Sequence, residues 1–138
     1  MKTTSKHFEY FKEHCQVWLA YWGLTDWRVQ FIHAPSALED GSNPMSYTTA
    51  CTEQMFAVIS FSDNQPESLI TPKEVAEAAF HEIAELLAMP LQIHAMSRWS
   101  TEEQIDSASH ALIQRLTNTI FEDYWTDCEE SEEPLYED

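Results

Sequence analysis

The chain has almost no glycine and few basic residues. Only two of its 138 residues are glycine, so it lacks the glycine-rich loops that bind phosphate groups. Its 24 acidic residues outnumber seven basic residues, and the formal net charge is −17. Proteins bind nucleic acids largely through cations that neutralise phosphates, so this charge argues against direct binding of DNA or RNA. The negative charge is compatible with a basic protein partner. It is also compatible with a protein that mimics a nucleic acid and so binds a DNA-binding protein.

Cysteine is also scarce, and long apolar runs are missing. The chain has three cysteines, Cys15, Cys51 and Cys128, and no C-x-x-C pair. An odd number without such a pair indicates reduced thiols in a cytosolic protein. The first residues lack the apolar stretch of a signal peptide, and no run reaches the length needed to cross a membrane. We therefore expect a protein of the cytoplasm with no membrane partner.

The acidic residues are densest at the end of the chain. Residues 126–138, TDCEESEEPLYED, carry seven acidic side chains and no basic one. Such a segment cannot bury enough apolar surface to fix its backbone. We expect a disordered tail over residues 126–138 and a single domain over residues 1–125, which is long enough to close one core.

The first half of the chain predicts one helix followed by three strands. Apolar residues recur at helical spacing over residues 3–22. Alternating or β-branched segments then predict strands at residues 27–34, 45–54 and 55–63. Short strands in succession favour an antiparallel or mixed sheet that is covered by helices, so the expected fold class is α+β.

Two further helices are predicted in the second half. The first covers residues 72–88 and ends before Pro90, because proline does not fit a helix interior. The second begins at a capping box formed by Ser100 and Glu103 and extends to about Trp125.

The stretch AAFHEIAELLAMP, residues 78–90, resembles a zinc-binding helix with one ligand replaced. The zinc pattern H-E-x-x-H places two histidines one helical turn apart, and its glutamate activates a water molecule at the metal. Here His81 and Glu82 are in place, but Glu85 stands where the second histidine belongs. Side chains four residues apart on a helix are close enough to share one ion, so His81 and Glu85 are candidate metal ligands. Glu82 is the candidate general base.

A helical wheel of this segment also allows a plain interpretation. His81 and Glu85 fall on a polar side, which a solvated helix would have without any metal. The apolar side is expected to pack on the sheet through Val75, Phe80, Ile83 and Leu87. Glu82 falls at the border between the two sides, which suits a general base.

The third metal ligand is expected from the start of the last helix. Glu102 projects toward the packed side of that helix, whereas Glu103 has a competing role in the capping box with Ser100. Glu102 is therefore the preferred ligand, and Glu103 is the second choice. The alternative is that both acids simply complement the helix dipole.

Taken together, these segments resemble a family of small phage and prophage proteins with a zincin-like metallopeptidase core. The resemblance rests on GLTDWRVQF (23–31), AAFHEIAELLAMPL (78–91) and EEQIDSASHAL (102–112), and on the order of the elements. In that family the metal helix reads H-E-x-x-H-x-L-L-x-x-P-L, and the last helix supplies an acidic third ligand. The resemblance implies His81, Glu85 and Glu102 as ligands of zinc or another divalent metal, with Glu82 as the catalytic residue.

Two functions follow from the resemblance and the charge. The first is a metal-dependent peptidase that acts in the cytoplasm of a bacterial host. Its activity is expected to be weakened or lost, because two carboxylate ligands cancel the charge of Zn²⁺ and reduce its effect on a bound water, and they favour ions such as Mn²⁺. The alternative is a catalytically inactive acidic protein that binds or inhibits a host protein, such as a nucleic-acid-binding factor.

Overall fold

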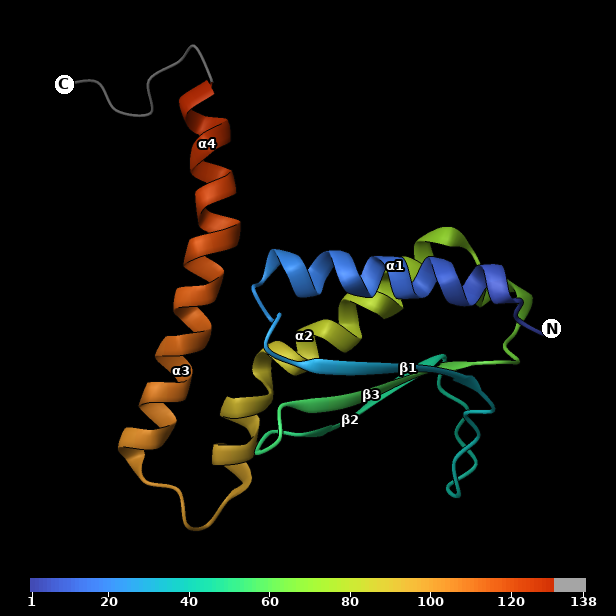
Figure 1. Ribbon diagram of the computed structural model, residues 1–138, viewed down its shortest axis with the longest axis horizontal. Coiled ribbons are helices and arrows are strands. Elements are labelled where there is room, and N and C mark those ends of the chain that lie inside the picture. The colour runs from blue at the N-terminus through green and yellow to red at the C-terminus, as the bar shows by residue number, and fades with distance from the viewer. Residues whose placement is uncertain (131–138) are drawn as a thin grey trace. The chain divides into compact units, whose positions relative to one another are not determined.

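The computed structural model describes residues 1–130 (Figure 1). They belong to two compact units, one comprising Met1–Pro90 and the other beginning at Leu91. The single domain expected over residues 1–125 stays a prediction. Residues 131–138, most of the expected tail, lie outside the described residues.

The expected α+β class is confirmed, and the sheet is mixed. Its strands are β1 (Arg28–Ala34), β2 (Ser46–Cys51) and β3 (Phe56–Ser62), in the order β1-β3-β2. β1 is parallel to β3, whereas β2 is antiparallel to it. The central strand β3 is the most deeply buried of the three, as expected for a strand rich in apolar residues with neighbours on both sides.

Helix α1 (Ser5–Tyr21) covers one face of this sheet. It begins at a capping box in which Thr4 and His7 satisfy each other's backbone N–H groups, and the chain turns away at Gly23, which has a φ of 66°. Phe11 is fully buried and stacks on Phe61 of β3 at 4.8 Å between ring centroids. The core of the first unit therefore includes the contact between α1 and the sheet.

Helix α2 (Pro72–Met96) is longer than predicted. The expectation that it ends before Pro90 was wrong, because the helix continues through this proline for six more residues. Proline removes one backbone donor and crowds the preceding turn, but a helix can resume beyond it. The boundary between the two units falls at Pro90, so the proline still marks a division of the chain.

The apolar side of α2 is oriented nearly as predicted, with one error. Val75, Ile83 and Leu87 are buried, but Phe80 is 40% exposed. Its ring contacts Trp18 of α1 and Trp22, the C-cap residue of that helix, at 4.9 and 5.4 Å between centroids, instead of packing on the sheet. Position 80 lies at the edge of the apolar side, where α1 is the neighbour.

The second unit contains a helical segment that runs without a break from residue 102 to residue 130. It consists of α3 (Glu102–Leu116), a π-helical turn η2 (Thr117–Phe121) and α4 (Glu122–Glu130). The N-cap is Thr101, whose capping-box partner is Gln104, so the predicted pairing of Ser100 with Glu103 was wrong. The Ser100 hydroxyl instead hydrogen-bonds His94. α4 extends the helix five residues into the segment expected to be a tail.

None of the helices in residues 1–130 is long and apolar enough to cross a lipid bilayer.

The packing of α1 on the sheet gives a first prediction. Phe11→Ala should lower the free energy of unfolding by about 3–5 kcal/mol, because the ring is fully buried and alanine leaves a cavity. Phe80→Ala is the matched control, and it should cost only about 1–2 kcal/mol because its ring is partly in water. Urea unfolding followed by circular dichroism measures both values. Equal losses would contradict the described packing.

Candidate metal centre

The polar side of α2 carries the histidine and glutamate that the sequence singled out. His81 Nε2 and Glu85 Oε1 are 3.2 Å apart, one helical turn from each other. Both side chains reach solvent, with exposed fractions of 69% and 45%. This pair can hold a cation between an imidazole nitrogen and a carboxylate oxygen, and it can equally form an ordinary hydrogen bond along the helix.

Glu82 lies in a different environment from its two neighbours. One residue of helix turns it about 100° away from His81, toward the sheet, where it is only 3% exposed. Ser46 Oγ donates a hydrogen bond to Glu82 Oε1 at 2.8 Å, and Thr48 Oγ1 donates one to Oε2. The carboxylate is therefore fixed in place by both of its oxygens.

The two hydroxyl donors come from alternate positions of β2. Ser46 and Thr48 point to the same face of the sheet because side chains alternate along a strand. In the antiparallel register they lie opposite Phe61 and Ile59 of β3, which are buried on the helix-covered face. The sequence reasoning missed both residues. Their signal was a pair of hydroxyl side chains two residues apart in a predicted strand.

Burial controls the charge of Glu82. Loss of water raises the pKa of its carboxyl above the ordinary 4.5, while the hydrogen bonds from Thr48 and Ser46 partly oppose this effect. The negative charge of Glu85 raises the pKa further, and His81 lowers it. A carboxylate with a raised pKa beside a solvent-exposed pair of candidate ligands has the properties that a general base requires.

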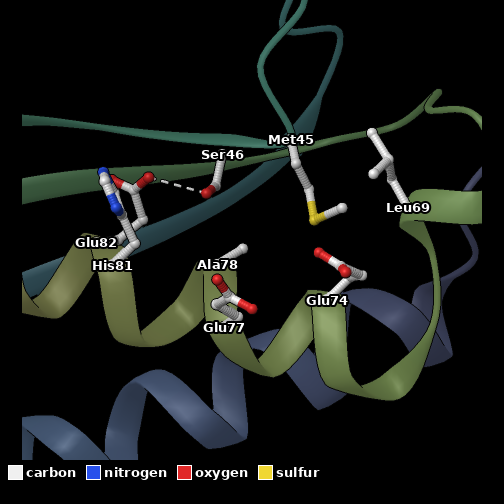
Figure 2. Close-up of a pocket in the computed structure, with 8 residues that line it drawn as sticks. All are labelled: Met45, Ser46, Leu69, Glu74, Glu77, Ala78, His81 and Glu82. Carbon is white, nitrogen blue, oxygen red and sulfur yellow. Dashed lines mark hydrogen bonds between the residues drawn. The ribbon is translucent and has the colours of Figure 1, made fainter.

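A hollow of about 310 Å³ opens beside these residues (Figure 2). Met45, Leu69 and Ala78 give it an apolar surface, and Glu74 and Glu77 of α2 add carboxylates next to His81 and Glu82. In Figure 2, His81 and Glu82 stand at one end of the hollow and Glu74 stands at the other. The cavity thus joins an apolar wall to a row of acids along one helix.

The structure brings together three of the four predicted site residues. One ligand atom each from His81, Glu82 and Glu85 lies within 4.8 Å of the other two. Glu102 belongs to the second unit, and its role as a third ligand stays a prediction. One of the two reasons for preferring it to Glu103 is gone, because Glu103 takes no part in the observed capping box.

Cys15 lies behind the site and is not a nucleophile there. Its thiol is fully buried and contacts the carbonyl oxygen of Ala79 at 3.9 Å. Burial, together with the nearby charge of Glu82, raises the pKa of this thiol far above its usual range. The thiol therefore stays protonated and serves as a small apolar group in the core.

Comparisons of the chain with protein-family models, with curated proteins and with solved structures find no match. The resemblance to the zincin-like phage family therefore stays an expectation.

The raised pKa of Glu82 predicts a pH-dependent stability. A carboxyl whose pKa is raised by folding stabilises the protein most when it is protonated, and this contribution is lost as the pH rises from 4.5 through the folded-state pKa. Glu82→Gln should therefore increase the free energy of unfolding at pH 7 relative to the unchanged protein. This gain should disappear as the pH is lowered below 4.5.

Urea unfolding at a series of pH values measures the difference between the two proteins. Glu13→Gln is the matched control, since Glu13 is exposed on α1 and its substitution should leave the pH profile unchanged. A gain that grows as the pH falls would mean that the hydroxyl bonds from Ser46 and Thr48 outweigh the cost of burial.

Proposed function

We propose that the protein is a zincin-like metalloprotein of phage type, which binds a divalent cation on α2 and acts in the cytoplasm of a bacterial host. His81 and Glu85 are the proposed ligands on this helix, and Glu82 is the proposed general base. Glu102 is the proposed third ligand, with Glu103 as the alternative. Residues of these types suit zinc and, because carboxylates are hard ligands, also Mn²⁺.

The observation that carries the proposal is the separation of the two donor atoms. Two ligands of a tetrahedral zinc ion, each about 2.05 Å from the metal, are about 3.3 Å apart. His81 Nε2 and Glu85 Oε1 are separated by 3.2 Å, so an ion can bind between them with little movement of either side chain. Both are accessible from solvent, which gives the ion a route to the site.

The chain contributes a fixed base to this site. Ser46 and Thr48 hold both carboxylate oxygens of Glu82, while each oxygen keeps a second lone pair with which to accept a proton. A bound divalent ion would supply Lewis acidity, which lowers the pKa of a water molecule. Glu82 would take the proton from that water, and its raised pKa makes it a better proton acceptor than an ordinary carboxylate.

Charge limits the proposed activity. Two carboxylates among the ligands neutralise a divalent ion, so its effect on water is weaker than in a site built from histidines. Glu74 and Glu77 add further negative charge in the adjoining hollow. We infer weak metal binding and little or no hydrolysis of peptides. Where a peptide does bind, the acids of the hollow favour a basic side chain over an acidic one.

The second candidate function is that of an acidic binding protein without catalysis. The hydrogen bond between His81 and Glu85 supports this function, because the two side chains satisfy each other without a metal ion. The net charge of −17 supports a basic partner, such as a host protein that itself binds nucleic acid.

Metal binding should raise the thermal stability of the protein. A ligand that binds only the folded chain stabilises it by about 2.7 kcal/mol at a concentration 100-fold above its Kd. Zn²⁺ or Mn²⁺ should therefore raise the melting temperature of protein purified without a metal-affinity tag, and a chelator should reverse the rise. Glu85→Ala should abolish this response, whereas Glu13→Ala, which removes an exposed helical carboxylate from α1, should preserve it.

The same assay separates the two candidate third ligands, because only one of Glu102→Ala and Glu103→Ala should weaken the response. No change in melting temperature with either metal, and no metal in any preparation, would reject the metalloprotein and leave the binding protein.

Restoring the second histidine should strengthen the site. Glu85→His replaces a carboxylate with the imidazole that this spacing serves in zinc sites, so the Kd for Zn²⁺ should fall. Glu82→Gln should leave zinc binding intact and remove any cleavage of a peptide substrate. Isothermal titration calorimetry and a peptide-cleavage assay measure these effects. Loss of zinc binding in Glu82→Gln would show that Glu82 is a ligand and not the base.

A further inference from the structure

The second unit has an apolar hollow of its own, on the side of the helical segment formed by α3, η2 and α4. The hollow has a volume of about 480 Å³. We call its lining the apolar face, which consists of Ile113, Leu116, Thr117, Ile120, Phe121 and Tyr124. All six residues lie between positions 113 and 124, so the hollow belongs to this segment alone.

Several side chains of the apolar face are exposed. Ile113 is 54% exposed and Ile120 is 52% exposed. Among the described residues of α3 and η2, none is buried. Apolar side chains arranged contiguously on one side of a helix are normally covered, and a large exposed patch of this kind marks an interaction site.

The π-helical turn shapes this face. Leu116, Ile120 and Tyr124 are spaced four residues apart, and on a regular α-helix such a series drifts by about 40° at each step. The i→i+5 bonding of a π-helical turn rotates the chain less per residue and offsets this drift. The turn covers residues 117–121, in the middle of the face, and π-helical turns occur frequently at functional sites.

The charge around the face decides which partner fits it. Residues 102–128 of this helical segment contain six acidic side chains and a single basic one, Arg115. A second copy of the chain would bring the same excess of negative charge to the contact, which is unfavourable. A cationic partner would instead be attracted by this negative charge. Anchors spaced by three and four residues suit a helix that lies along the face with its apolar side inward.

We propose that the apolar face of the second unit is a docking site for a basic, amphipathic helix of another protein. The apolar side of that helix covers Ile113, Ile120 and Phe121, and its lysine or arginine side chains pair with acidic side chains of the same helical segment. The proposal is independent of the metal site on α2.

Binding of a designed peptide to the full chain tests this proposal. The probe is a fluorescently labelled helical peptide of 18 leucine and lysine residues, with the leucines on one side. We expect saturable binding by fluorescence anisotropy, weakened at least tenfold by Ile120→Asp and by Ile113→Asp. Val17→Asp is the matched control, since Val17 is 58% exposed on α1 and its substitution should not change the affinity. Circular dichroism verifies that each variant is folded.

Two further peptides separate shape from charge. A scrambled peptide of the same composition has no apolar side, and a peptide with glutamate in place of lysine has no positive charge, so both should bind at least tenfold more weakly. Failure of the first peptide to bind would overturn the proposal. So would equal binding of the scrambled peptide, or binding that is insensitive to both aspartate substitutions. A dimer of the free protein that Ile120→Asp converts to monomer would identify a second copy as the occupant instead.

Discussion

The hydrogen bonds from Ser46 and Thr48 to Glu82 are the contact on which the candidate site depends. They join α2 to the edge strand β2 and place a buried carboxylate beside the exposed pair formed by His81 and Glu85. Without such donors, burying a carboxylate to 3% exposure would lower the free energy of unfolding. Because the donors are on a strand and the acceptor is on a helix, the contact fixes the rotation of α2 about its own axis. This rotation in turn keeps His81 and Glu85 facing solvent.

Much of the fold could be predicted from the sequence because local patterns determine it. Alternation predicted β1, the content of β-branched and aromatic residues predicted β2 and β3, and helical periodicity predicted α1 and most of α2. The errors occurred where contacts distant in the sequence, or small differences between neighbouring residues, determine the end of a helix, its cap or the packing of a side chain. Pro90 is tolerated inside α2, Thr101 rather than Ser100 caps α3, and the rings of Trp18 and Trp22 attract Phe80 away from the sheet. The π-helical turn has no periodic signal of its own, since the same residues fit an α-helix.

The site was predictable only in part, for a related reason. The spacing of His81, Glu82 and Glu85 along one helix reveals their proximity without any tertiary information. The donors to Glu82 lie more than 30 residues earlier, on β2, and which face of that strand meets α2 depends on the register with β3. The neighbouring hollow likewise combines α2 with Met45 and Leu69, from two separate connections. Contacts between residues this far apart in the sequence become visible only in the folded chain.

The negative charge connects both proposals, but it acts in opposite ways. At the proposed metal site, Glu74, Glu77 and the proposed carboxylate ligands would attract a cation and at the same time reduce its power to activate water. On the second unit, the proposed role of the acidic side chains near the apolar face is recognition alone, which involves no such conflict. A chain with 24 acidic and seven basic residues is therefore better suited to holding cationic ligands than to hydrolysis. Binding, of a metal ion or of a basic helix, is therefore the use of the fold that we propose ahead of catalysis.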